Sequence, residues 1–240
     1  MSNIDAVVIG GTGIGRLLYA LGGDDETIET TFGAVEGRTI ASDGRRVLLI
    51  QRHSGGHKTP PHKVNYRAMA LAAKSSGARV CLSSAAVGSL REDWRPGTLA
   101  VCSDMIDLTY RRLTLFDDEV VHTDMSVPFP AASYLSEACK MVVATAQARA
   151  VYVGCDGPRY ETPAEVRYLR QIGGDIVGMT ASSEAIVMKE AGVPYGCLGV
   201  VTNLGCGLAS GSLDHSEVVD VMKTKGQEVV DIFLRAVSLV

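Results

Sequence analysis

Short apolar runs of strand length alternate with segments of helical character along the whole chain, and this alternation constrains the fold more than any other feature. Runs at 4–9, 79–84 and 195–201 are each followed by small or polar residues. Such alternation is typical of a sheet covered by helices. Neither an internal repeat nor a linker interrupts the 240 residues. We therefore expect one α/β domain over residues 1–240, with a central mixed β-sheet flanked by helices.

The clearest local signal is a helix start within residues 154–184. Thr162 is a suitable N-cap, Pro163 suits the first helical position, and Glu165 completes a capping box. Tyr160 and Glu161 then lie just outside the helix, after a Gly-Pro turn. An aromatic ring beside an acid suits a flat heterocycle that offers a hydrogen-bond donor. The same pattern is also compatible with a solvated turn that carries a surface acid.

Composition excludes several classes of function. The net charge is −4 without a long basic run, so we expect no nucleic-acid partner. The six cysteines are scattered without framework spacing, which is typical of reduced thiols in a cytoplasmic protein. No apolar run is long enough to span a bilayer, so we expect no membrane association.

Polar residues that suit an anion follow several predicted strands. Thr12 lies in the glycine-rich turn 10–15, where backbone N–H groups and a hydroxyl can meet a phosphate. The turn is not a good dinucleotide fingerprint, because Arg16 stands where the third glycine belongs. A simple turn at the end of a strand remains an alternative. Thr180 likewise follows a short strand, at 175–177, and lies close to a helix N-terminus.

Residues 33–51 are predicted to form a β-hairpin around Ser42-Asp43-Gly44. Its second strand leads to Arg52 and His53; arginine is the natural bidentate partner of phosphate. The histidines at 53, 57 and 62 do not match a familiar metal-ligand spacing, so we expect no metal site.

Three further positions follow from the order of elements. Asn203 lies at the C-terminal end of the predicted strand 195–201, and the small residues 85–89 follow another strand, where a ligand can approach the backbone. His215 is predicted as the first residue of the last helix, a position that favours a neutral imidazole. His122 lies within residues 104–130, where the apolar residues show no strong helical or strand periodicity. Every polar cluster thus lies at the end of a strand, where ligands bind such sheets.

A resemblance covers nearly the whole chain. G-G-T-G, R-H-x-x-x-H, P-P-H-K-V-N-Y-R-A, A-V-G-S-L-R-E, G-P-R-Y-E-T-P-A-E, V-G-M-T and V-T-N occur in this order. Together they resemble the trimeric purine nucleoside phosphorylase and methylthioadenosine phosphorylase family. The resemblance implies a nucleoside phosphorylase-like fold and a homotrimer. It also implies cleavage of a purine nucleoside by inorganic phosphate, a co-substrate, to free base and ribose 1-phosphate, without a cofactor.

The same resemblance implies roles for individual residues. Asn203 and Glu161 would face the purine, with Asn203 stabilising the leaving base. Phosphate would be held by Thr12, Arg52, His53, the backbone of Ala86, and Thr180. The nucleoside would contact Tyr160, Met179, His215 and His122, the last reaching the 5′ pocket of a neighbouring subunit.

Substrate choice is expected from two of these positions. Relatives that take adenine nucleosides carry aspartate in place of Asn203. The combination of Asn203 with Glu161 resembles the pattern of relatives that take 6-oxopurine nucleosides such as inosine or guanosine. His215 resembles ribonucleoside-specific members, whereas the R-H loop and His122 resemble the methylthio branch. The alternative substrates are therefore 5′-methylthioinosine and 5′-methylthioadenosine. Two other classes remain open: a non-catalytic nucleoside-binding protein, and an oxidoreductase, for which the glycine turn is the only support.

Overall fold

A computed structural model describes residues 3–53, 59–111, 113–209 and 215–240. Strands and helices alternate as expected, with the antiparallel hairpin inserted between the first two central strands. The elements in chain order are β1 (Ala6–Gly10), α1 (Ile14–Tyr19), β2 (Asp24–Ile28), β3 (Val35–Ser42), β4 (Arg45–Gln51), a 3₁₀ turn (Pro61–Lys63), α2 (Tyr66–Ser75), β5 (Val80–Ser89), β6 (Leu99–Asp107), α3 (Ala132–Val142), β7 (Gln147–Gly154), α4 (Pro163–Gln171), β8 (Ile176–Gly178), α5 (Ala181–Ala191), β9 (Tyr195–Leu204) and α6 (His215–Ser238).

The sheet is mixed, and one half of it closes on itself. Its strand order is β2-β3-β4-β1-β5-β8-β7-β6-β9, and β9 also pairs with β5. The strands β5, β8, β7, β6 and β9 therefore form a closed ring of hydrogen-bonded neighbours, while β2, β3, β4 and β1 extend from β5 as an open sheet. Closure gives these five strands no free edge between them and brings their ends close together.

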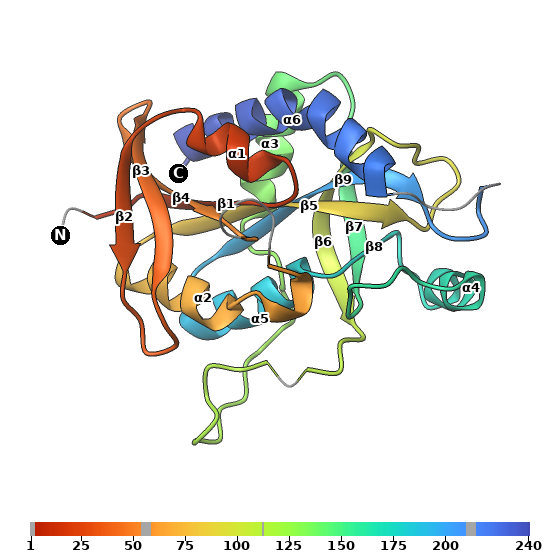
Figure 1. Ribbon diagram of the computed structural model, residues 1–240, viewed down its shortest axis with the longest axis horizontal. Helices are drawn as coiled ribbons and strands as arrows, with labels where there is room; N and C mark the ends of the chain where they lie inside the picture. Colours follow the sequence, from red (N-terminus) through yellow and green to blue (C-terminus); the bar gives the residue numbers. More distant parts are fainter. Residues whose placement is uncertain (1–2, 54–58, 112, 210–214) are drawn as a thin grey trace.

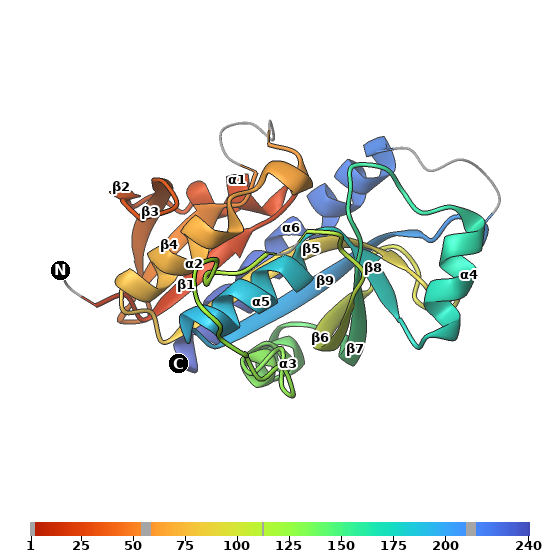
Figure 2. The same cartoon turned by 90° about the horizontal axis from the view of Figure 1, so that it is seen from below.

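Helices cover both faces of the sheet (Figures 1 and 2). On one face α2 and α5 pack over a core that includes Tyr66, Met69 and Met188. On the other face α1, α3 and α6 cover a second core, which includes Leu18, Leu135 and Phe233. A smaller cluster packs α4 against the ends of β7 and β8. The expected α/β class, a mixed sheet flanked by helices, is confirmed.

The local signals that were strongest in the sequence are confirmed. Thr162 caps α4, and both hydrogen bonds of the capping box with Glu165 are present. The hairpin β3–β4 turns at Asp43 and Gly44, which have φ angles of 48° and 75°. Two successive positive φ values are those of the tight turn that matches strand twist.

Other boundaries differ from the sequence-based expectation, in which the residue pattern predicts helices over 63–76 and 131–146. Helix α2 begins at Tyr66 rather than Lys63, because the Asn65 side chain accepts from the Ala68 backbone N–H and caps it there. The strand expected to end at Ser84 continues as β5 to Ser89, since its small residues pair with β9 along their whole length. Helix α3 ends at Val142 rather than Ala146, because the backbone of Val143 is extended.

Three elements were missed or shifted. Strand β2 has four exposed residues and one half-buried residue, so it carries no apolar alternation. Helix α1 has only six residues and follows a glycine turn, which hides its periodicity. The sequence pattern predicts a helix capped by Ser182, but α5 begins at Ala181, with Thr180 in the N-cap position.

Candidate functional site

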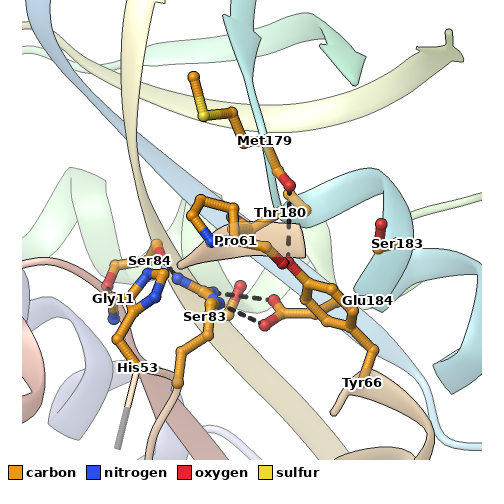
Figure 3. Close-up of polar contacts among 12 residues, drawn as sticks. Gly11, His53, Pro61, Tyr66, Ser83, Ser84, Met179, Thr180, Ser183 and Glu184 are labelled. Carbon is orange, nitrogen blue, oxygen red and sulfur yellow. Dashed lines mark hydrogen bonds and ion pairs between the residues drawn. The ribbon is translucent and has the colours of Figure 1, made fainter. Parts of the chain in front are cut away.

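A cavity of about 250 Å³ opens where the ends of β1, β4, β5, β8 and β9 meet. Nine of the eleven residues expected at the site line it, although they are spread over almost 200 positions of sequence. They are Thr12, Arg52, His53, Ala86, Tyr160, Glu161, Met179, Thr180 and Asn203. Figure 3 shows Gly11, His53, Ser84 and Thr180, which come from separate elements, close to one another.

The glycine turn after β1 forms part of that end. A Cβ on Gly11 would lie 2.5 Å from Arg52 Nη1 and 2.7 Å from the Ser84 carbonyl oxygen, so only glycine lets these groups approach. The Gly11 N–H donates to Ser84 Oγ at 3.1 Å, which ties the turn to β5. Next to it, His53 donates from Nδ1 to the Thr59 carbonyl oxygen at 2.8 Å, which fixes the ring.

Arg52 is buried and already paired. Its Nε and Nη2 donate to Glu184 Oε1 and Oε2 at 2.5 and 2.9 Å, and Nη1 donates to the Ser84 carbonyl at 2.8 Å. Burial would lower the pKa of the guanidinium, but the charge and hydrogen bonds of Glu184 raise it above its ordinary value. Because Glu184 matches its charge, Arg52 alone does not give this end of the cavity a net positive charge.

Thr180 lies at the entrance of α5, beside Arg52. Its backbone N–H and that of Ala181 both donate to Tyr152 Oη, at 3.1 and 3.2 Å. A ligand at this helix end would therefore meet the Thr180 side chain rather than those two N–H groups. Residues 180 and 184 are one helical turn apart and share a face, which places the threonine and the carboxylate on the same side of α5.

The other end of the cavity is shaped by a β-bulge in β9. Val87 pairs with Val201, but Gly88 pairs with Asn203, so Thr202 is the extra residue. Side chains normally alternate between the two faces of a strand, and the bulge breaks this alternation. As a result Thr202 and Asn203, although consecutive, both line the cavity.

Tyr160 and Glu161 reach the same cavity from the loop before α4. Glu161 is half-buried, and burial raises the pKa of its carboxyl group above the ordinary value of 4.5, with a smaller contribution from the nearby Glu165. Met179 approaches this loop at Gly157, where a Cβ would collide with its sulfur. Tyr160 and Glu161 are thus half-buried at the cavity, within a loop whose neighbouring residues are exposed.

Of the two remaining expected residues, the described His122 does not line the cavity, and the side chain of His215 is not described. His122 is exposed on the segment between β6 and α3, which projects from the body of the molecule (Figure 1). His215 is the first residue of α6, as expected, but its side chain lies outside the described part of the structure, as does its proposed cap Asp214. The histidine at 57 is also outside it. Among the residues that the structure describes, no group of three His, Cys, Asp or Glu side chains is placed to hold a metal.

The sequence analysis missed Glu184, Tyr195 and Val218. Glu184 is the one charged residue in a first turn of α5 that otherwise contains only small residues, and that pattern was the signal that could have found it. Tyr195 opens β9 and donates from Oη to Glu184 Oε2 at 2.5 Å. Val218 contributes an apolar wall from α6, a contact between distant elements that no local pattern indicates.

The described helices give no sign of a membrane anchor, since none combines the length and apolar character that a bilayer crossing needs.

Comparison with known proteins agrees with this arrangement. A family model described as the phosphorylase superfamily matches residues 5–238. A probable 6-oxopurine nucleoside phosphorylase of Moorella thermoacetica is 36% identical over 236 residues, covering 96% of this chain and 91% of that protein. A probable S-methyl-5′-thioinosine phosphorylase of Methanothermobacter thermautotrophicus is 37% identical over 235 residues, covering 96% and 82%.

A solved structure shares the whole fold. Methylthioadenosine phosphorylase from Schistosoma mansoni, in complex with adenine, superposes with a TM-score of 0.92 at 26% identity, covering 99% of this chain and 92% of that one.

Proposed function

The chain belongs to the phosphorylase superfamily, and from that premise we propose that it cleaves 6-oxopurine nucleosides, such as inosine and guanosine, with inorganic phosphate. The products are the free base and ribose 1-phosphate. The chain is therefore a pentosyltransferase, in keeping with relatives named as nucleoside phosphorylases.

One observation carries the proposal. A single cavity has residues suited to an anion at one end and an amide beside a carboxylate at the other. Thr12, Arg52, His53, Ala86 and Thr180 form the anion end. Asn203 and Glu161 form the opposite end, and the intervening wall includes Met179. An anion at the first end lies next to a sugar held between the ends, as transfer to the anomeric carbon requires.

The phosphate end works by placed hydrogen bonds rather than by net charge. Three of the five guanidinium N–H groups of Arg52 are used within the protein, two by Glu184 and one by Ser84. One N–H on Nη1 and one on Nη2 are left over, which suits two phosphate oxygens. The phosphate dianion then stabilises the positive charge that develops on the ribose as the glycosidic bond breaks.

The leaving group is stabilised from the other end. The Asn203 amide is 7% exposed, and Nδ2 donates one hydrogen to the Leu204 carbonyl oxygen at 3.0 Å. Its second hydrogen is available for N7 or O6 of the purine. A fixed donor aimed at developing negative charge acts electrostatically and is worth most when water is excluded. No covalent intermediate on the protein is needed.

The presence of both Asn203 and Glu161 at this end of the cavity favours a 6-oxopurine base. Glutamate accepts from N1–H of hypoxanthine or guanine, whereas adenine has no hydrogen there. An adenine nucleoside would cover this half-buried carboxylate without giving it a donor, a penalty of about 1–3 kcal/mol. The relatives named for 6-oxopurines and for methylthioinosine both act on this class of base.

The second candidate substrate is 5′-methylthioinosine. Val218 lines the cavity from α6, and an apolar side chain suits a methylthio group better than a hydroxyl. The base chemistry at Glu161 and Asn203 is the same for both substrates, so the two candidates differ only at the 5′ end.

We further propose a homotrimer in the cytoplasm. Tyr110, Val120 and Val127 are 92%, 88% and 53% exposed on the projecting segment that carries His122. An interface between copies would bury them and bring His122 to a neighbour's cavity. All six cysteines are free thiols, in keeping with a reducing compartment. Light scattering after size exclusion tests the trimer.

A substrate panel tests the function. The protein is incubated with phosphate and inosine, guanosine, adenosine, 5′-methylthioinosine or 5′-methylthioadenosine, and the released bases are identified. We expect hypoxanthine and guanine, with rates that depend on phosphate. Release of adenine alone would contradict the base assignment, and binding without release would favour a non-catalytic nucleoside-binding protein.

A further inference from the structure

Glu184 is the most deeply buried carboxylate beside the cavity, and the reaction described above makes no direct use of it. Its side chain and that of Arg52 are each 1% exposed. Removing two charges from water costs several kcal/mol, and such a pair is retained where its geometry serves a purpose. Glu184 itself does not line the cavity.

The contacts of Glu184 form a continuous chain away from the ligand. Arg52 donates to both carboxylate oxygens, Tyr195 Oη donates to Oε2, and Tyr195 Oη also lies 2.5 Å from Ser83 Oγ. Tyr195 is held in turn by packing against Phe129, with ring centroids 5.8 Å apart. The carboxylate is therefore held by Tyr195 of β9, whose hydroxyl also contacts Ser83 of β5, and it in turn holds the guanidinium of Arg52.

The geometry of Arg52 depends on this support. The fork of Nε and Nη2 grips the carboxylate, and Nη1 is held by Ser84, so the plane of the guanidinium has no freedom to rotate. The two remaining N–H groups then lie in a fixed plane at the anion end. Without Glu184, the arginine would lose two of its three anchors within the described structure.

We propose that Glu184, supported by Tyr195, is a positioning residue that orients Arg52 for phosphate in the proposed phosphorolysis. It does not touch substrate and acts through the guanidinium. The proposal therefore predicts an effect on phosphate that is transmitted only by Arg52. A purely electrostatic role predicts the opposite sign, because removing a negative charge beside a phosphate dianion would tighten binding.

The direct test is Glu184→Gln, with the steady-state constants for phosphate and inosine measured separately. Loss of charge-assisted hydrogen bonds predicts that KM for phosphate rises ~10-fold or more while KM for inosine changes less than ~2-fold. Glu190→Gln is the matched control, since it makes the same change later on α5, where Glu190 binds Thr114 and Leu115 instead. The control should keep the wild-type KM for phosphate.

A double-mutant cycle separates positioning from structure. Arg52→Lys keeps the charge but cannot form the two-pronged contact. If Glu184 acts through Arg52, Glu184→Gln adds less than ~2-fold to KM for phosphate in the Arg52→Lys background. An equal increase in both backgrounds would overturn the proposal, as would an unchanged or lowered KM in the single variant.

If the Glu184→Gln variant does not fold, the Tyr195→Phe variant tests the proposal instead. It removes one hydrogen bond to the carboxylate and leaves the ion pair, so KM for phosphate should rise ~3-fold. Tyr168→Phe, on exposed α4, is its control. A Tyr195→Phe enzyme with wild-type KM for phosphate would count against the proposal. Failure of the proposed function is distinct, because the wild-type protein would then show no phosphate-dependent turnover.

Discussion

Thr202 Oγ1 donates to Asn203 Oδ1 at 3.0 Å, and together with the bond from Asn203 Nδ2 to the Leu204 carbonyl oxygen this contact holds the plane of the amide. In the proposed reaction, an amide held in this plane would present its second Nδ2 hydrogen to the purine. The bulge that makes Thr202 the extra residue of β9 is what brings the two side chains to the same cavity. The orientation of the leaving-group donor thus follows from the register of the sheet.

Removal of the Asn203 amide should cut turnover far more than it weakens phosphate binding. Loss of one fixed donor to developing charge typically costs ~100-fold in kcat, so Asn203→Ala should lose about that much with inosine. Thr202→Val leaves the amide but not its orientation, and a smaller loss, ~10-fold, is expected. Steady-state kinetics with phosphate varied provide the check. Equal losses in kcat and in phosphate affinity would contradict the leaving-group role.

Asn203→Asp should move the preference towards adenine nucleosides. Thr202 would still hold one oxygen of the new side chain, while the other meets the 6-amino group as an acceptor instead of meeting O6 as a donor. The ratio of kcat/KM for adenosine over inosine should rise by ~10-fold or more. Competition between the two nucleosides in one reaction measures this ratio, and an unchanged ratio would show that position 203 does not read the 6-substituent.

Because the pKa of the Glu161 carboxyl group is raised, we expect nucleoside binding to depend on pH. Burial raises the pKa of its carboxyl group above 4.5, and the ionised form is the one that accepts from N1–H. As pH falls through this raised pKa, KM for inosine should rise. Glu161→Gln should bind inosine weakly at every pH and lose that dependence. A wild-type KM that stays flat to pH 4.5 would contradict the role.

The same carboxylate links pH to stability, and the sign is opposite to that of a salt-bridged acid. A raised folded-state pKa contributes stability that is fully present below the unfolded pKa and is lost as pH rises through the folded pKa. Glu161→Gln should therefore have a higher Tm than the wild type at pH 7, with the difference shrinking towards pH 4. Thermal unfolding at the two pH values is the measurement; a lower Tm at pH 7 would refute it.

Two glycines should separate the two substrates. Gly11→Ala pushes on Arg52 and Ser84, so it should raise KM for phosphate by ~10-fold or more and leave KM for inosine near its wild-type value. In the Gly157→Ala variant the new methyl group pushes on Met179, so KM for inosine should rise while KM for phosphate stays near its wild-type value. Each variant is the other's control, and a variant that changes both constants equally would show that the cavity does not have two independent ends.

The sequence predicted what is encoded locally. The cap at Thr162 and the turn at Asp43 and Gly44 depend on neighbours within a few residues, so both were found correctly. Strand β2 was missed because an exposed edge strand has no apolar face to signal it. The closed ring depends on pairings such as β5 with β9, which join residues more than 100 positions apart.

The site shows the same division. Thr12, Arg52 and Asn203 were found because polar residues at strand ends are a local pattern that the family resemblance then ordered. Glu184 was not found, because its role depends on an ion pair with Arg52, which is 132 positions away in the sequence. The tertiary fold determines which distant charges form ion pairs. The sequence around one acidic residue in a helix therefore does not identify the basic residue that pairs with it.

The central claim is that phosphate and a 6-oxopurine nucleoside meet in one cavity and exchange the ribosyl group. The most direct measurement follows inosine and inorganic phosphate together, with hypoxanthine quantified by absorbance and the sugar phosphate by ³¹P NMR. The account predicts equal amounts of hypoxanthine and ribose 1-phosphate, and no hypoxanthine when phosphate is left out. Hypoxanthine accompanied by free ribose in the absence of phosphate would contradict it.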